Sequence, residues 1–258
     1  MKFEGNWKMC QASGLEDLFL KECVKLCSDE EEFAVFKRNS IFTKIIGNDI
    51  RKKQISDVWY DFVKDTNLID YLKKFKTNDI FGYPITYMYP KTGLISPGTL
   101  CFMSVLHDIN TRLIDVKGKV VCEIGSGYGG QSKIFLDYGA SEVQLIDRTE
   151  TLSLARKYLS KFSYNRLRYS TINEIPEQEY DLVVSNWCLS ELDRQGTKFY
   201  LDNVISNSQN GYFLVNYRNS KDRDWLLSEL KNVFSNVTIE EEVPKTNENV
   251  NHVITCSK

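Results

Sequence analysis

Four glycines within six residues are the clearest chemical signal in this 258-residue chain. They lie in the turn Gly125-Ser126-Gly127-Tyr128-Gly129-Gly130, which directly follows the apolar run Val120–Ile124. The run is typical of a buried parallel strand, and residues 131–138 predict an amphipathic helix that leaves the turn. Strand, glycine turn and helix bring a ligand close to bare backbone and to the positive end of a helix. The stretch therefore predicts a ligand site at this turn.

Two carboxylates flank the glycine turn in the sequence. Asp147 follows a predicted strand at 142–146, and its two oxygens suit the two hydroxyls of a ribose. Glu123 lies inside the strand before the turn, where a negative charge would repel a pyrophosphate but tolerate a cationic cofactor. The turn satisfies both the dinucleotide pattern G-x-G-x-x-G and the pattern E-x-G-x-G-x-G. Both kinds of cofactor remain open at this point.

The residues before the turn predict a separate helical region. Apolar residues recur mostly at helical spacing from Leu15 to Lys76, so residues 1–80 are expected to cap the site or to form a dimer interface. Residues 81–98 contain three prolines and three glycines, which exclude a continuous helix. We expect a linker or a lid there. Its tyrosines, Tyr83, Tyr87 and Tyr89, either pack on the core or present hydroxyls to a ligand.

A helix at 100–114, which carries His107, leads into strands that alternate with helices over residues 99–258. The predicted strands are at 119–124, 142–146, 167–171, 180–185, 211–217, 237–242 and 250–255, and the helices between them at 131–138, 150–162, 194–205 and 221–234. This alternation predicts an α/β fold, a doubly wound and mostly parallel sheet with helices on both faces. The last two strands have no helix between them, so they predict a hairpin with an antiparallel strand at the end of the sheet.

Composition excludes several classes of partner. The net charge of -2 gives no reason to expect nucleic acid or an acidic membrane. Seven scattered cysteines, an odd number, suit a reducing cytoplasm, and Cys23 and Cys27 fit buried thiols better than a metal pair. Because His, Asp and Glu show no convincing metal spacing, we expect a metal-independent protein.

The pattern from Glu123 to Gly129 resembles motif I of the class I S-adenosylmethionine-dependent methyltransferases. Asp147 stands where that group holds the ribose, and Tyr180–Leu192 is similar to its motif IV. More narrowly, Ser185–Leu192 resembles a segment of the sugar O-methyltransferase family of bacterial surface polysaccharide pathways, although Leu192 replaces a methionine and Cys188-Leu189 departs from a Ser-Phe pair. Many class I enzymes place an acidic residue against the adenine after the third strand, where this chain has Ser170 to Asn173.

The resemblance implies a Rossmann-like methyltransferase sheet that binds S-adenosyl-L-methionine and transfers its methyl group to a sugar or a small phosphorylated precursor. The acceptor base would be Glu191 or His107, whose structural alternatives are a helix-start carboxylate and a core histidine. Arg218, with Tyr87 and Tyr89, would contact the substrate, or Arg218 is an ordinary surface arginine. An NAD-dependent oxidoreductase and a non-catalytic binding module are the other hypotheses. The cofactor-binding residues implied are Glu123, Gly125, Ser126, Gly127, Gly129, Asp147, Arg148, Thr171, Ile172, Asn186 and Trp187.

Overall fold

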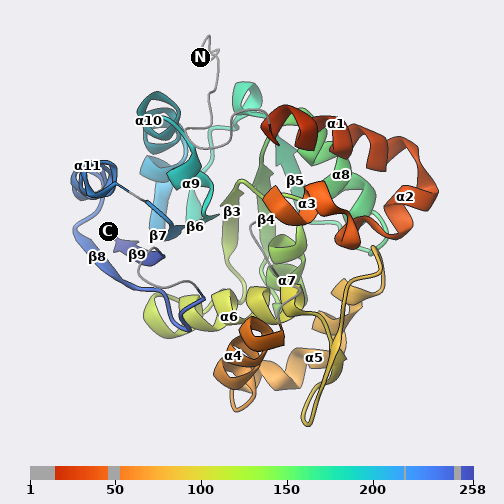
Figure 1. Ribbon diagram of the computed structural model, residues 1–258. Helices are drawn as coiled ribbons and strands as arrows, with labels where there is room; N and C mark the ends of the chain where they lie inside the picture. Colours follow the sequence, from red (N-terminus) through yellow and green to blue (C-terminus); the bar gives the residue numbers. More distant parts are fainter. Residues whose placement is uncertain (1–14, 46–52, 218, 247–250) are drawn as a thin grey trace.

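The computed structural model describes residues 15–45, 53–217, 219–246 and 251–258. Its main feature is a seven-stranded sheet with the strand order β5-β4-β3-β6-β7-β9-β8 (Figure 1). The strands are β3 Val120–Ile124, β4 Glu142–Ile146, β5 Leu167–Ser170, β6 Tyr180–Asn186, β7 Ser208–Val215, β8 Asn236–Glu241 and β9 His252–Ser257. Strands β3 to β7 pair in parallel, and β9 runs antiparallel to both β7 and β8. The predicted α/β sheet with its antiparallel C-terminal hairpin is confirmed.

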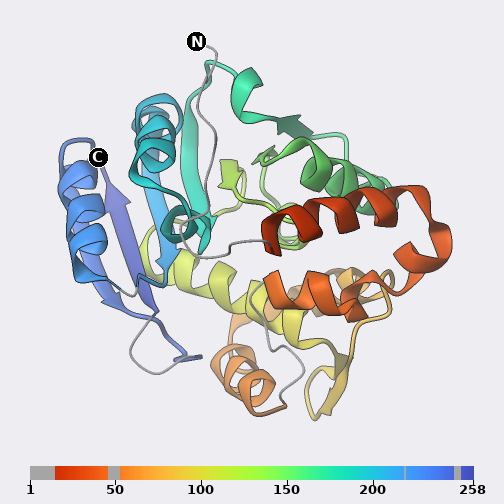
Figure 2. The same ribbon diagram turned by 45° about the horizontal axis from the view of Figure 1, so that its top comes forward.

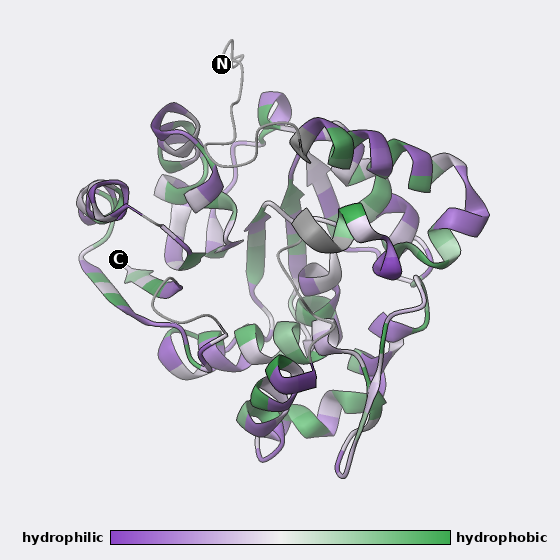
Figure 3. Cartoon of the chain, in the orientation of Figure 1, coloured by the Kyte–Doolittle hydropathy of each residue, from purple (hydrophilic) through white to green (hydrophobic). Residues whose placement is uncertain are grey.

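Helices cover both faces of this sheet. On one face, α6 Pro97–Arg112, α7 Gly130–Tyr138 and α8 Thr149–Leu159 bury the odd-numbered side chains of β4, such as Val143. On the other, α9 Cys188–Glu191, α10 Arg194–Asn203 and α11 Ser220–Lys231 bury Ile146 and Val183. A strand that is covered on both faces favours apolar residues at nearly every position, and Figure 3 shows β3 and β4 as mostly hydrophobic.

The N-terminal region forms two groups of helices. The first contains α1 Leu15–Ser28, α2 Glu30–Ala34, η1 Phe36–Arg38 and α3 Ser40–Ile45, and its helix α1 lies along α8 (Figure 2). The second contains α4 Lys53–Val63, η2 Asn67–Tyr71, α5 Leu72–Phe75 and η3 Lys76–Asp79, and its helix α4 packs on α6. Buried side chains of both groups belong to the same hydrophobic cluster as the α6–α8 face of the sheet. The prediction of a helical N-terminal region is confirmed.

The segment between the helices and the sheet contains a small hairpin, made of β1 Tyr87–Tyr89 and β2 Gly93–Ile95. Tyr89 is buried, its ring stacks on Tyr60 of α4 at 4.3 Å, and its hydroxyl donates to Asp57 over 2.8 Å. The Tyr89 hydroxyl therefore already has its hydrogen-bond partner in α4. The prediction that Tyr89 presents its hydroxyl to a ligand is wrong, and the core-packing alternative holds for this residue.

Two boundaries differ from the predicted ones for identifiable reasons. Strand β7 begins at Ser208, earlier than expected, because Ser208 and Asn210 pair with β6 although neither residue favours strands. Helix α6 begins at Pro97, because proline is tolerated in a first helical turn and Ser96 caps it by accepting the amide of Thr99 over 3.1 Å.

Candidate functional site

The glycine turn lies where the strand order of the sheet reverses, between β3 and β6, which is where open α/β sheets bind their ligands. Gly125, Gly127 and Gly129 have φ values of 76°, 55° and 85°, a region that side chains rarely adopt. A Cβ on Gly125 would lie 2.4 Å from the Cβ of Cys188. The first glycine therefore lets the start of α9 pack directly against the turn.

Asp147 and the glycine turn come together as the sequence predicts. The Gly127 amide donates to one carboxylate oxygen of Asp147 over 2.9 Å, and the Arg148 amide donates to the other over 2.7 Å. Burial raises the pKa of Asp147 to about 6, against the effect of these two amides. Asp147 is therefore mainly ionised at neutral pH, beside the amides of the turn.

Glu123 has a different state from the one expected. Its side chain is 3% exposed and accepts a hydrogen bond from the Ser132 hydroxyl of α7. Burial, with the nearby charge of Asp147, raises its pKa to about 8, so Glu123 is mainly protonated at neutral pH. A neutral carboxyl group does not repel a pyrophosphate. In the free protein Glu123 therefore carries little charge, and it favours a cationic cofactor over a dinucleotide only as far as binding of the cation lowers this pKa.

Three buried polar atoms around the turn have no hydrogen-bond partner within the described part of the chain. They are Ser126 Oγ in the turn, Gln131 Oε1 in the first turn of α7 and Asn186 Oδ1 at the end of β6. Leaving such an atom unsatisfied costs about 1–3 kcal/mol. Three other buried atoms in the described residues also lack a partner, namely Gln144 Oε1, Tyr180 Oη and Ser185 Oγ. The three around the turn fit a site that receives a polar ligand. Gln131 was not predicted from the sequence, although it is the first side chain after the glycines.

The end of β6 is strained beside the same turn. Trp187 has φ 65° and ψ -20°, the left-handed region, which is a genuine outlier for a bulky residue. Its amide donates to the Leu214 carbonyl over 2.7 Å, and its carbonyl accepts the Ser190 hydroxyl over 2.7 Å. Strain of this kind costs about 1–3 kcal/mol and is concentrated at functional sites. Asn186 and Trp187 thus lie where the sequence placed them, at the carboxyl end of β6.

The two predicted bases are in different places. Glu191 is the last residue of α9, one helical turn beyond Trp187, and its charge acts on Cys188 beside Gly125. His107 lies against Phe62 of α4, with ring centroids 5.0 Å apart, and burial lowers its pKa. Helix α6 approaches the turn with Phe102 instead, since a Cβ on Gly130 would lie 2.4 Å from that ring. His107 thus packs beside α4, and its role as the base stays a prediction.

The other predicted cofactor residues lie at the starts of the helices that follow β4 and β5. Arg148 is the N-cap residue of α8, and Thr171 is the N-cap residue of η4 Ile172–Glu174. The Thr171 hydroxyl donates to Glu174 over 3.2 Å, so an acidic side chain does follow the third parallel strand, one position after the stretch inspected in the sequence. Tyr87 lies in β1 of the hairpin, and Arg218 lies outside the described residues.

Within the described ranges, no group of three or more His, Cys, Asp or Glu side chains could hold a metal ion. Cys23 is fully buried in α1, and burial raises the pKa of its thiol well above the usual range. Over the same ranges, no helix is both long and apolar enough to cross a bilayer.

Comparison with known proteins finds this fold repeatedly. No family model matches the chain. A Haemophilus influenzae protein described only as uncharacterized is 30% identical over 89 residues, which cover 31% of this chain and 35% of that protein. The match thus spans about a third of the relative's length.

Among solved structures, a candidate RNA methyltransferase from Pyrococcus horikoshii has a TM-score of 0.52 at 16% identity, over 75% of this chain and 99% of that one. A candidate methyltransferase from Streptococcus mutans, solved with S-adenosylhomocysteine, covers 55% of this chain and 90% of its own at 15% identity and a TM-score of 0.43. The first likeness shows that the chain has the Rossmann-like fold of the S-adenosylmethionine-dependent methyltransferases.

Proposed function

We propose that the protein is an S-adenosylmethionine-dependent methyltransferase. The observation that carries the proposal is the pairing of Asp147 with the Gly127 amide at the switch point of a methyltransferase fold. The residues present fit this cofactor. Asp147 would hold the ribose hydroxyls, the glycine backbone would approach the amino-acid part, and the unpartnered Ser126 hydroxyl offers it a further polar contact. Thr171, Ile172 and Arg148 would surround the adenine.

When bound, the cofactor supplies an electrophilic methyl group on a sulfonium centre. The protein's part is to align the acceptor with that methyl group and to remove the acceptor proton. The strained Asn186–Trp187 pair would border the reacting centre. Glu191, one turn further along the chain, would take the proton from the acceptor hydroxyl. Glu123 would respond to a nearby cation by losing its proton, because a positive charge lowers the pKa of a carboxyl group.

A single segment supports the acceptor half of the proposal. The stretch Ser185–Leu192 resembles the sugar O-methyltransferases of surface polysaccharide pathways, so we propose a sugar or a small phosphorylated or nucleotide-linked precursor, methylated in the cytoplasm. Arg218, with Tyr87 at the hairpin, would contact it. A homodimer through the N-terminal helices is part of the same proposal. The Pyrococcus protein is described by its action on RNA, so RNA belongs in any acceptor screen.

Isothermal calorimetry with S-adenosylmethionine, S-adenosylhomocysteine and NADH tests the cofactor. Asp147→Ala should abolish binding of the first two. The matched control is Asp181→Ala. Asp181 also accepts a backbone amide, that of Val120 over 2.8 Å, but it lies at the amino end of β6, away from the glycine turn. Binding of NADH alone would establish the dinucleotide alternative. If none of the three compounds binds, the hypothesis of a non-catalytic binding module remains.

Transfer of a radiolabelled methyl group to sugar nucleotides, sugar phosphates and RNA then tests the acceptor. Labelling of a sugar precursor that Glu191→Gln abolishes, with cofactor affinity unchanged, would support both the acceptor and the base. Labelling of RNA alone would refute the sugar half of the proposal and leave the cofactor half intact.

A further inference from the structure

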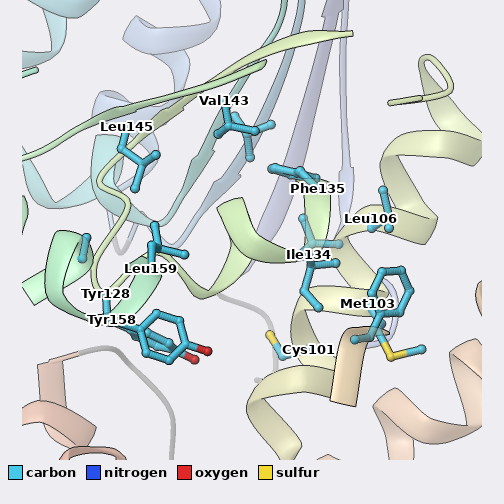
Figure 4. Packing of buried hydrophobic residues seen from close by; sticks show 14 of the residues in the cluster. Cys101, Met103, Leu106, Tyr128, Ile134, Phe135, Val143, Leu145, Tyr158 and Leu159 are labelled. Carbon is cyan, nitrogen blue, oxygen red and sulfur yellow. The ribbon is translucent and has the colours of Figure 1, made fainter. Parts of the chain in front are cut away.

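The side chain at the centre of the glycine turn belongs to a contact with the N-terminal helices. Tyr128, between Gly127 and Gly129, is only 6% exposed. Its ring meets Phe36 of η1 edge to face, with centroids 5.3 Å apart, and Phe42 of α3 at 5.7 Å. Tyr158 of α8 packs on it at 5.0 Å, and Figure 4 shows the two tyrosines side by side. With Phe102 of α6 at 6.1 Å, the Tyr128 ring contacts four elements outside the turn.

Lys37, the neighbour of Phe36, adds an uncommon contact to this cluster. It is 9% exposed, and its ammonium nitrogen lies 4.8 Å from the Tyr128 ring centroid and 4.7 Å from that of Tyr158. It donates to the Asn78 carbonyl and, over 3.4 Å, to the Tyr158 hydroxyl. A buried ammonium group is costly for stability unless it is paired and hydrogen-bonded, so these contacts and the two rings fix the place of the Lys37 side chain.

The segment η1 is also held from its far side. The Lys37 amide donates to the Gly82 carbonyl over 3.0 Å, and a Cβ on Gly82 would lie 2.5 Å from the Phe36 ring. Arg38 stacks on the Tyr83 ring at 3.8 Å and donates to the Tyr83 carbonyl over 2.7 Å. Because the loop at 82–83 fixes one side of η1, the position of Phe36 and Lys37 determines where the Tyr128 ring can lie.

A shift of Tyr128 would reach the backbone of the site directly. The amide of the preceding residue, Gly127, donates to Asp147, and the amide of the following one, Gly129, donates to the Ser126 carbonyl over 2.9 Å. Gly129 is the left-handed N-cap residue of α7 and is packed against Leu159, which leaves it little room. A movement of the Tyr128 ring would therefore move the amides of Gly127 and Gly129, which shape the turn.

We infer that Phe36 and Lys37 are positioning residues of the cofactor site, which hold the glycine turn in its binding conformation through Tyr128. The inference rests on the proposed function and assigns a role in cofactor binding to a segment that precedes the methyltransferase domain. Burial lowers the pKa of Lys37 to about 7, with Asp79 opposing and Lys133 reinforcing the shift, so the contact also has a neutral form near neutral pH.

Phe36→Ala, compared with Phe75→Ala, tests the inference. Both phenylalanines are fully buried in the N-terminal region, but the ring contacts of Phe75 are with Tyr71 and not with Tyr128. Phe36→Ala should weaken S-adenosylhomocysteine binding about tenfold in calorimetry, and Phe75→Ala less than twofold. Equal effects of the two variants would refute the inference. If Phe36→Ala does not fold, Phe36→Leu should still weaken binding several-fold, and unchanged affinity in that variant would refute it equally.

A double-mutant cycle separates positioning from general loosening. In a Tyr128→Ala background, Phe36→Ala should have no further effect on affinity for S-adenosylhomocysteine, because the ring through which Phe36 acts on the turn is absent. Additive effects would contradict the inference. Lys37→Met, which keeps the aliphatic stem, should also weaken binding, and Lys37→Arg should restore part of it.

Amide hydrogen exchange of residues 125–130 keeps this inference distinguishable from the proposed function, since it needs no ligand. Phe36→Ala should speed exchange of these amides, whereas Phe75→Ala should not. If the wild-type protein binds no S-adenosylhomocysteine but this exchange pattern is found, the proposed function fails and the coupling stands. If the protein binds the ligand and the two variants exchange alike, only the coupling fails.

Discussion

Glu123→Gln should change the pH dependence of stability in a direction and by an amount that the structure specifies. Glu123 is buried, 3% exposed, and its pKa rises from 4.5 to about 8. Between pH 4.5 and about pH 8, the Glu123 carboxyl group is therefore mainly protonated in the folded state and mainly ionised in the unfolded state. The stability associated with this proton is complete below pH 4.5 and is lost as the pH rises through about 8. Glutamine cannot titrate but keeps an acceptor for the Ser132 hydroxyl, so the variant should lack this decline.

The size of the decline follows from the two pKa values. The full shift corresponds to roughly 5 kcal/mol, at about 1.36 kcal/mol per pH unit. Roughly 2 kcal/mol of this is already lost at pH 6, so the free energy of unfolding should fall by a further 2–3 kcal/mol, approximately, between pH 6 and pH 9. Asp147 and Lys37 titrate in both proteins, so the difference between the two profiles removes their contributions.

Urea unfolding of both proteins at pH 6, 7, 8 and 9, with the slope on denaturant compared at each pH, measures this difference. The advantage of the variant should increase with pH and level off above about pH 8. Parallel profiles, with a constant difference between the two proteins, would refute the description of Glu123 as a buried and mainly protonated carboxyl group.

Three further predictions concern the turn, its carboxylate and the end of β6. Gly125→Ala should abolish binding of S-adenosylhomocysteine in calorimetry, because its Cβ would lie 2.4 Å from a neighbouring atom at φ 76°, whereas Gly98→Ala, with its nearest neighbour 3.8 Å away, should leave binding unchanged. Affinity for S-adenosylhomocysteine should fall by up to about tenfold per unit as the pH drops below the Asp147 pKa of about 6, and a flat titration down to pH 5 would contradict this. Ser190→Ala and Ser208→Ala each remove a buried hydroxyl that lies 2.7 Å from a carbonyl three residues earlier, and chemical denaturation should show a loss of about 1 kcal/mol for Ser208→Ala. The loss should be larger for Ser190→Ala, because Ser190 Oγ also accepts the Asn216 amide over 3.2 Å. Only Ser190→Ala should weaken S-adenosylhomocysteine binding, because only its bond holds the strained residue at the end of β6.

The sheet was predictable because each of its parts carries a local signal. Apolar runs, glycine breaks and amphipathic helices alternate with little ambiguity from Val120 onward. The position of Asp147 followed as well, since parallel strands end at one edge and the acid comes directly after a strand. Strand pairing then determined what local pattern could not, such as the polar start of β7 at Ser208.

Two properties of the site residues could not be predicted from the sequence. They are the direction in which a side chain points and whether a buried carboxyl group keeps its proton. Helix α6 buries residues around most of its circumference, so its pattern does not tell that Phe102 is the residue that meets the glycine turn. The state of Glu123 depends on how many groups cover it, which a single sequence does not record. Tyr89 was ambiguous because a hairpin tyrosine can face either way until its partner, Asp57, is known.

The contact between Phe36 and Tyr128 has no signature in the sequence. The two residues are far apart in the chain, and each belongs to a stretch with an ordinary local explanation, a helical segment and a glycine turn. Lys37 likewise reads as one charge among many until its burial is seen. Long-range contacts of this kind decide how the N-terminal helices relate to the site, and they required the structure.

A structure of the complex with S-adenosylhomocysteine tests the central claim most directly. The account predicts the ribose hydroxyls within roughly 3 Å of the Asp147 carboxylate, the amino-acid part over the glycine turn, and the sulfur beside Asn186 and Trp187. S-adenosylhomocysteine bound elsewhere, or the pyrophosphate of a dinucleotide on the amino end of α7 in a parallel experiment with NADH, would contradict it.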